Sequence, residues 1–159
     1  MKVIIVGGVA GGATTAARLR RLDQDVEIVI LERGSYISYA NCGLPYHVSG
    51  VINSQEDLLL TTPETMKARL NIDVRIRHEV IEVLSAEKKI VIRNLNTNTV
   101  FEESYDKLVL STGSSPLKPP IPGIDNERIK SLWTVPDAIA IKTLIKQYQV
   151  KNAVIVGGG

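Results

Sequence analysis

The chain contains a single cysteine, Cys42, which lies between Asn41 and Gly43 and shortly before Pro45. Asn suits a helix cap and Pro suits the first turn of a helix, so this spacing predicts that a short helix begins here. The dipole at a helix start stabilises a thiolate, which makes the thiol a nucleophile near neutral pH. A lone cysteine is equally often an inert small hydrophobe. The polar neighbours and the Gly/Pro setting favour the reactive interpretation.

A glycine-rich segment near the N-terminus, GGVAGG, follows the apolar run VIIV. Its glycines fit the G-x-G-x-x-G pattern, except that Val9 takes the middle position. Gly7 permits a tight turn off a strand, and Gly12 lets the next helix lie close to the sheet, where its N-terminus offers N–H groups and a positive dipole to a pyrophosphate. The predicted contacts are the amides of Gly7, Gly8, Val9, Ala10, Gly11 and Gly12.

A second apolar run, VEIVIL, ends at Glu32, which lies 20 residues after Gly12. This is the separation expected for the acid that binds ribose hydroxyls in a dinucleotide-binding βαβ unit. The alternative is an ordinary strand, turn and helix with chance glycines. The strand before the loop, the helix after it and the acid at the expected distance all count against that alternative.

Further elements can be predicted from the spacing of apolar residues. A helix over 12–22 places Arg18 and Arg21 on one face, which is either a solvated face or a site for the phosphates of an anionic substrate. A second helix is predicted over 62–70. Short β-branched runs predict one more sheet strand and a small antiparallel meander, over 73–76, 79–84, 89–93 and 99–103.

The C-terminal part begins with a strand over 107–111 that runs into Thr112 and Gly113, followed by a proline-rich stretch. A helix is predicted over 135–148, and a strand over 153–156 enters a final run of glycines. That ending resembles the start of a second dinucleotide fold, although an ordinary C-terminal strand is the alternative. The predicted domains are therefore a nucleotide-binding domain over 1–115, a linker over 116–134 and the start of a second nucleotide-binding domain over 135–159.

Composition narrows the function classes. The 159 residues are 44% hydrophobic with a net charge of +2 and no long Lys/Arg block, so neither nucleic acid nor membrane is expected as a partner. The N-terminal run is broken by glycines, which argues against a signal peptide and places the protein in the cytoplasm. One cysteine and two histidines predict no internal disulfide and no metal site.

Three stretches, GGVAGGATTAARLRRLD, SYANCGLPY and YDKLVLSTGSSPLKPPIPG, resemble the flavoprotein pyridine nucleotide-disulfide oxidoreductases. Within that family they are most similar to the single-cysteine branch of coenzyme A-disulfide and NADH-dependent persulfide reductases. The resemblance implies an α/β, Rossmann-like FAD-binding domain with a parallel sheet and a β meander, and a missing part that binds NADH or NADPH. It also implies that Cys42 is the redox nucleophile and that the FAD contacts include Arg33, Val80, Ser111, Thr112 and Gly113.

The same resemblance implies a small thiol or disulfide substrate that is similar to coenzyme A, and a homodimer at full length. Residues that match coenzyme A contacts are Thr14, Arg18, Arg21, Ser38, Asn41 and Cys42. Ala10 stands where peroxidases and water-forming oxidases carry a histidine, which favours disulfide or persulfide chemistry. Arg18 stands where a glutamine is common in the family, and Leu70 stands where some members have a lysine contact. The identity of the thiol-carrying substrate is therefore left open. Two alternatives are an NADH oxidase that uses a Cys42 sulfenate and a nucleotide-binding module without turnover.

Overall fold

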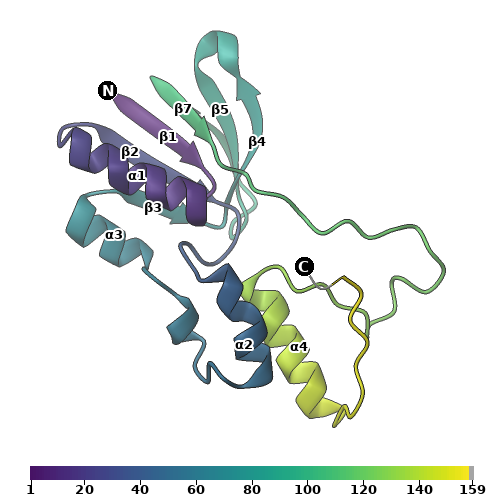
Figure 1. The fold of residues 1–159 in the computed structure, drawn as a ribbon. Helices are drawn as coiled ribbons and strands as arrows, with labels where there is room; N and C mark the ends of the chain where they lie inside the picture. Colours follow the sequence, from purple (N-terminus) through teal and green to yellow (C-terminus); the bar gives the residue numbers. More distant parts are fainter. Residues whose placement is uncertain (158–159) are drawn as a thin grey trace. The chain divides into compact units, whose positions relative to one another are not determined.

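The computed structural model describes residues 1–157 of the chain. They form two compact units, each assembled from two stretches of sequence (Figure 1). The first unit contains Met1–Tyr39 and Leu59–Ser114. The second contains Ala40–Leu58 and the chain from Ser115 onward. Each unit is described by itself.

The first unit is built on a four-stranded parallel sheet in the order β3-β2-β1-β7. The strands are β1 (Lys2–Val6), β2 (Glu27–Glu32), β3 (Asp73–Ile76) and β7 (Lys107–Leu110). In the register of β1 and β2, Ile4 lies opposite Val29. The carboxyl ends of β1, β2 and β7 therefore meet at one edge of the sheet, which is where parallel sheets of this kind bind ligands.

A second, three-stranded antiparallel sheet of order β4-β5-β6 follows β3. Its strands are β4 (His78–Leu84), β5 (Lys89–Asn94) and β6 (Val100–Ser104), and a short 3-10 turn, η3 (Ser85–Glu87), joins the first two. This arrangement confirms the predicted α/β fold class with a parallel sheet and a small meander. Each predicted strand of the meander differs from the observed one by a single residue at one or both ends, the usual precision for element boundaries.

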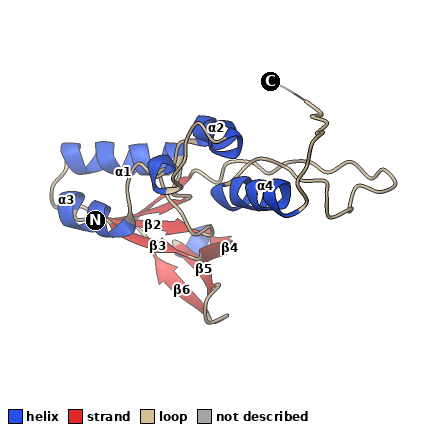
Figure 2. Ribbon diagram, turned by 90° about the horizontal axis from the view of Figure 1, so that it is seen from below, coloured by secondary structure: helices blue, strands red, loops and turns tan. Residues whose placement is uncertain are grey.

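Both faces of the parallel sheet are buried, because successive side chains of a strand point to opposite faces. On one face Ile5 and Ile30 pack against Ala16 of α1 (Ala10–Leu22) and Met66 of α3 (Pro63–Leu70). On the other face Ile4, Val29 and Leu31 pack against Ile90 and Ile92 of the meander. Figure 2 shows α1 and α3 on one side of the sheet and β5 and β6 on the other. Burial on both faces explains why β1 and β2 are continuous apolar runs.

Arg20 of α1 is buried and joins the C-terminal ends of two helices. Its guanidinium donates to the carbonyls of Asp23 and Gln24 at the end of α1, and to those of Leu70 and Asn71 at the end of α3. The last carbonyls of a helix lack partners within the helix and carry its negative dipole end, so a cation is stabilised there. Arg20 therefore has a structural role that distinguishes it from the exposed arginines of the same helix.

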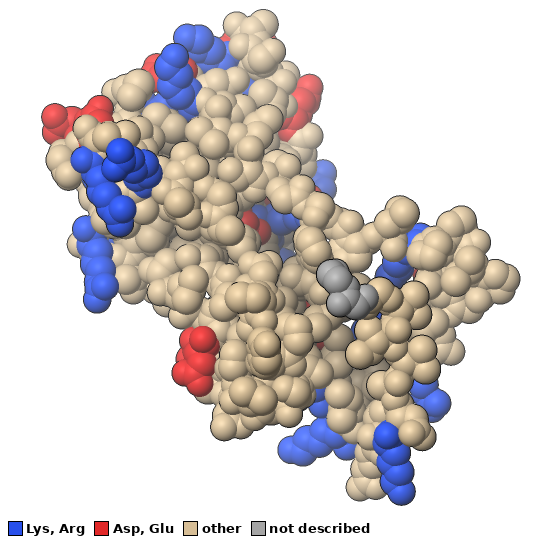
Figure 3. All heavy atoms as spheres, viewed as in Figure 1, with Lys and Arg blue, Asp and Glu red and all other residues tan. Residues whose placement is uncertain are grey.

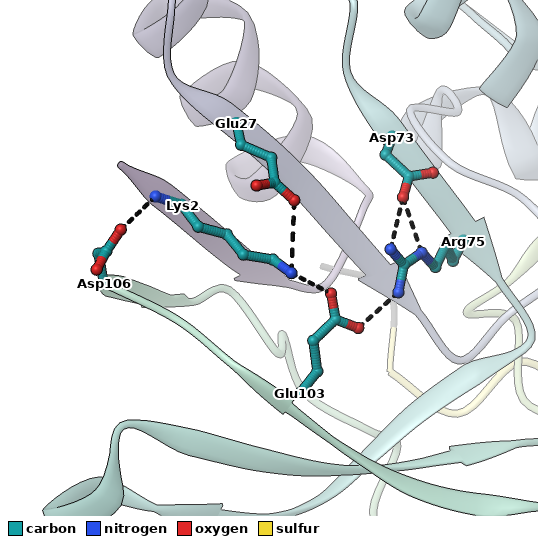
Figure 4. A network of polar contacts seen from close by, with 6 residues as sticks. All are labelled: Lys2, Glu27, Asp73, Arg75, Glu103 and Asp106. Atoms are coloured by element: carbon teal, nitrogen blue, oxygen red, sulfur yellow. Dashed lines mark hydrogen bonds and ion pairs between the residues drawn. The ribbon is translucent and has the colours of Figure 1, made fainter.

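A network of charged groups connects the parallel sheet to the meander (Figure 4). Glu103 on β6 contacts the Lys2 ammonium at 2.7 Å and the Arg75 guanidinium at 2.6 Å. Arg75 also contacts Asp73, and the Lys2 backbone N–H donates to Asp106 at 2.5 Å. The network therefore ties β1 and β3 to β6. Burial opposes ionisation of Glu103, but hydrogen bonds and the positive charges of its two partners outweigh burial and lower the pKa of its carboxyl.

Glu103→Gln is expected to weaken the fold at neutral pH by about 1 to 3 kcal/mol, the usual worth of hydrogen bonds to a charged group, reduced by partial exposure. A carboxyl with a lowered pKa in the folded state contributes its stability above its unfolded pKa. It loses that contribution as the pH falls through the folded pKa. Below about pH 4.5 the variant should therefore lose less stability than the wild type does.

Urea unfolding of both proteins between pH 7 and pH 2 measures this effect. Glu102→Gln is the matched control, because Glu102 is a more exposed neighbour that pairs with Lys89. Wild-type and Glu103→Gln curves that run parallel across the acid range would show that Glu103 contributes nothing to the pH dependence.

The second unit consists of short helical segments and long loops. A 3-10 turn, η1 (Asn41–Gly43), leads into α2 (Leu44–Ser49), and a further turn, η2 (Glu56–Leu58), follows. The predicted helix over 135–148 is α4 (Val135–Gln147), which packs against α2. Its start is a capping box, since the Thr134 side chain accepts the Asp137 N–H while Asp137 accepts the Thr134 N–H. No helix among residues 1–157 is long and apolar enough to cross a membrane.

The prediction of a strand over 153–156 is wrong, because these residues form no strand in the structure. Val154, Ile155 and Val156 are at least 84% exposed. A strand needs a neighbour to satisfy its N–H and C=O groups and to bury its apolar side chains, and no described segment pairs with this one. The last two glycines of the predicted turn lie outside the described residues, and the predicted domain boundaries stay predictions.

Candidate functional site

The glycine-rich turn joins the end of β1 to the start of α1. Gly7 has a φ of +98°, and a Cβ there would lie 2.1 Å from the carbonyl oxygen of Ser111. A Cβ on Gly12 would lie 1.8 Å from the carbonyl oxygen of Gly7. These two positions therefore need glycine for the reasons expected from the sequence: a left-handed turn and a close approach of α1.

Glu32 lies at the carboxyl end of β2, 9% exposed, and both of its carboxylate oxygens accept backbone N–H groups. One oxygen accepts from Gly8 at 2.8 Å, and the other from Gly34 at 2.6 Å. The Gly8 carbonyl in turn accepts the Ser38 N–H at 3.0 Å. The acid predicted to bind ribose thus also holds the turn in place.

The end of β7 contributes the third side of this site. The Ser111 N–H donates to the Val6 carbonyl at 2.8 Å, and a Cβ on Gly11 would lie 3.3 Å from the Ser111 hydroxyl. Thr112 and Gly113 follow and are exposed. Val80 lies in β4 next to a β-bulge between Val80 and Glu82, and it packs against the core on the meander side.

The start of α1 presents backbone N–H groups. Val9 occupies the N-cap position without a side-chain cap, and the first turn contains no acidic residue. The Ala13 N–H donates to the Val9 carbonyl, so the preceding N–H groups lie ahead of the first intrahelical bond. The tight turn that Gly7 and Gly12 permit, these N–H groups and the Glu32 carboxylate together fit the ADP half of a dinucleotide.

The predicted substrate residues of the first unit lie on α1 and just after β2. Thr14, Arg18 and Arg21 are exposed on α1, at spacings that place them on one face. Ser38 is half-buried and takes a φ of +43°. Arg33, a predicted FAD contact, is exposed. Figure 3 shows Lys and Arg side chains in several separate groups on one face of the molecule.

Asn41 and Cys42 belong to the second unit, where both are exposed. The next residue, Gly43, is buried, and a Cβ there would lie 3.0 Å from Leu58. Leu44 is buried at the start of α2. The predicted helix start is confirmed, with Cys42 in the 3-10 turn that precedes α2. The exposed Cys42 thiol is thus followed directly by two buried residues, Gly43 and Leu44, which fix the backbone on its C-terminal side.

A hollow of about 200 Å³ lies in the same unit. It is lined mostly by apolar side chains, some from the start of α2 and some from the chain before α4: Asn41, Leu44, Pro45, Leu132 and Trp133. Further along α2, His47 is buried, and its Nδ1 lies 2.9 Å from the Ile52 carbonyl oxygen. Among residues 1–157, no group of three or more His, Cys, Asp or Glu side chains could hold a metal ion.

Comparisons with known proteins agree across the chain. The model of the pyridine nucleotide-disulphide oxidoreductase family matches residues 1–159. The coenzyme A disulfide reductase of Staphylococcus haemolyticus is 43% identical over 158 residues, which are 99% of this chain and 35% of that protein. The chain thus spans about a third of the length of such relatives.

Two solved structures resemble the fold closely. The crystal structure of reduced Bacillus anthracis CoADR-RHD has a TM-score of 0.90 at 49% identity and covers 93% of this chain and 27% of that one. A NAD-dependent persulfide reductase from A. fulgidus has a TM-score of 0.88 at 33% identity and covers 92% of this chain and 28% of that one.

Proposed function

The chain belongs to the pyridine nucleotide-disulphide oxidoreductase family, and from this membership we propose that it forms the FAD-binding part of a disulfide or persulfide reductase. Its electrons come from NADH or NADPH, bound by a part of the protein beyond this chain. Cys42 is its redox-active thiol, and a coenzyme A-like disulfide is its substrate. The full-length form is a homodimer in the cytoplasm.

The observation that carries this proposal is the glycine turn at the carboxyl edge of the parallel sheet. Gly7 and Gly12 let the turn pack against Ser111 and let α1 start close to the turn, and the first N–H groups of α1 suit a pyrophosphate. Glu32 would hold the adenosine ribose, while Arg33, the Val80 backbone, Ser111, Thr112 and Gly113 complete the FAD contacts. FAD supplies, when bound, two-electron transfer between the nicotinamide and a sulfur centre.

Cys42 performs the sulfur chemistry. Its thiolate attacks one sulfur of R–S–S–R, the S–S bond breaks, and R–S⁻ leaves and takes up a proton. The product is a mixed disulfide between Cys42 and the second R–S group. Two electrons that originate from the nicotinamide, together with one proton, then restore the Cys42 thiolate and release a second R–SH. A single cysteine is sufficient for this cycle, because the substrate supplies the other sulfur.

Features of each unit, taken separately, support the proposed substrate class. The hollow beside Asn41 offers apolar surface to the arm of a thiol carrier. Thr14, Arg18 and Arg21 form a polar, exposed face suited to the carrier's phosphates. Similarity to coenzyme A disulfide reductases supports this assignment. Ala10 in the glycine turn argues against peroxide as the substrate.

Replacing Arg18 and Arg21 together with alanine tests the proposed substrate. We expect kcat/KM for coenzyme A disulfide to fall by at least about tenfold, since each arginine–phosphate hydrogen bond is worth roughly 1.5 to 3 kcal/mol. Reduction of a small uncharged disulfide should change little. The measurement compares both substrates in the complete reductase that carries this chain.

Arg69→Ala is the matched control, because Arg69 is an exposed arginine on a different helix, α3, and is not one of the predicted substrate residues. Equal losses of kcat/KM with the two disulfides would contradict the proposed phosphate-binding role of α1. A wild-type protein that binds FAD and reduces neither disulfide would remove the proposed reductase activity.

A further inference from the structure

We propose that Glu32 is a positioning residue that sets the shape of the nucleotide-binding turn before any nucleotide binds. This inference rests on the proposed FAD site and adds a second role for its acid. The carboxylate acts as a clamp: it connects the turn after β1 with the chain that leaves β2, while keeping acceptor capacity for a ribose.

The geometry of the clamp is specific. Each oxygen of Glu32 accepts one N–H, from Gly8 on one side and from Gly34 on the other. The side chain is buried, so water competes little for these bonds. Gly8 is enclosed, since a Cβ there would lie 2.7 Å from Ile37 and 3.2 Å from Ile30. An N–H in such a place needs an internal acceptor, and Glu32 provides it.

The clamp is compatible with ribose binding. An ionised carboxylate has about four lone-pair positions, and the two backbone N–H groups occupy one on each oxygen. The remaining positions can accept the two ribose hydroxyls. If the clamp orders the turn by itself, FAD binding does not have to supply the ordering of this backbone. Glu32 thus contributes to affinity by direct contact and by preorganisation.

The test measures hydrogen exchange of single backbone amides by NMR in the 159-residue chain. Glu32→Ala should reduce protection of both the Gly8 and Gly34 amides by about tenfold or more. In Glu32→Gln only one side-chain oxygen is left, and the NH₂ group faces the other amide. One of the two amides should therefore keep its protection while the other loses it.

The Gly7 amide is the internal control, because it donates to the Leu31 carbonyl at 2.8 Å and does not involve Glu32. If Gly8 and Gly34 stay protected in Glu32→Ala while Gly7 is also protected, the clamp is overturned. If Gly7 loses protection as well, the variant has unfolded, and an acid titration of the wild-type chain replaces it as the test. The ¹³C shift of the Glu32 carboxyl reports its protonation, which should move the Gly8 and Gly34 amide signals together. Amide signals that do not follow the carboxyl signal would overturn the proposal.

Titration of FAD separates this inference from the proposed function. Glu32→Gln should bind FAD at least about tenfold more weakly than the wild type, because it loses acceptor positions for the ribose. A complete wild-type reductase that binds no FAD, while the 159-residue chain shows the expected amide pattern, would contradict the proposed function and leave the clamp intact.

Discussion

Cys42→Ser is expected to lower disulfide reduction by the complete reductase by roughly a thousandfold or more, the scale of effect seen when a catalytic nucleophile is removed. The hydroxyl of serine cannot form a mixed disulfide, and Cys42 is the one cysteine of these 159 residues. The loss should appear in kcat with both charged and uncharged disulfides. Steady-state turnover with each substrate provides the measurement.

The fold should be unaffected by this change, because Cys42 is exposed and is not part of the buried support made by its neighbours. Retained FAD content and an unchanged unfolding midpoint establish that Cys42→Ser is folded. A folded Cys42→Ser protein with substantial disulfide reductase activity would refute the thiol mechanism.

Gly12→Ala is expected to destabilise the chain by about 4 kcal/mol or more, which is exceptional for one methyl group. Its Cβ would lie 1.8 Å from the Gly7 carbonyl oxygen and 2.9 Å from the carbon of the same group. Both atoms belong to the backbone of a turn that is fixed by Glu32 and Ser111, so neither can move aside cheaply. Domains of this size are stable by only about 5 to 15 kcal/mol, so a large part of that stability would be lost.

Gly11→Ala is the matched control, one residue earlier on the same helix. A Cβ there meets only the Ser111 side chain, with the hydroxyl at 3.3 Å, and alanine favours a helix over glycine by up to about 1 kcal/mol. Urea unfolding of both variants measures the difference. Similar stabilities for Gly11→Ala and Gly12→Ala would show that α1 does not approach the turn as closely as the structure has it.

Much of the first unit could be predicted because its determinants are local. Strands buried on both faces appear as uninterrupted apolar runs, and the glycines at positions 7 and 12 mark the turn and the close helix. The spacing from Gly12 to Glu32 predicted an acid beside the turn, and the Glu32 carboxylate accepts the Gly8 N–H there. For these features, neighbouring residues decide the structure, so one sequence is enough to recognise them.

Other features depend on partners that are distant in sequence. The clamp on Gly8 and Gly34 was missed, because the motif identifies a ribose acceptor and says nothing of the backbone groups around it. Arg20 could not be distinguished from Arg18 and Arg21 by spacing alone. Its burial depends on the end of α3, about 50 residues away. The consecutive carbonyls at two helix ends became visible only in the structure.

The strand predicted over 153–156 failed for a related reason. Its apolar pattern matches that of β1, but a strand forms only where another strand accepts its hydrogen bonds. The apolar pattern of a segment therefore indicates that it can form a strand, and the neighbouring strands in the fold determine whether it does. The helix over 135–148 was predicted correctly because its apolar spacing and the proline in its first turn are local signals.

Counting reducing equivalents tests the central claim most directly. The complete reductase is treated with coenzyme A disulfide, freed of excess reagent, and titrated with its preferred reduced nicotinamide, NADH or NADPH, under anaerobic conditions. If Cys42 holds a mixed disulfide, the wild type consumes one equivalent more than Cys42→Ser and releases one coenzyme A thiol per chain. An extra equivalent without released thiol would indicate a sulfenate instead. Equal consumption by the two proteins would contradict the assignment of Cys42 as the redox centre.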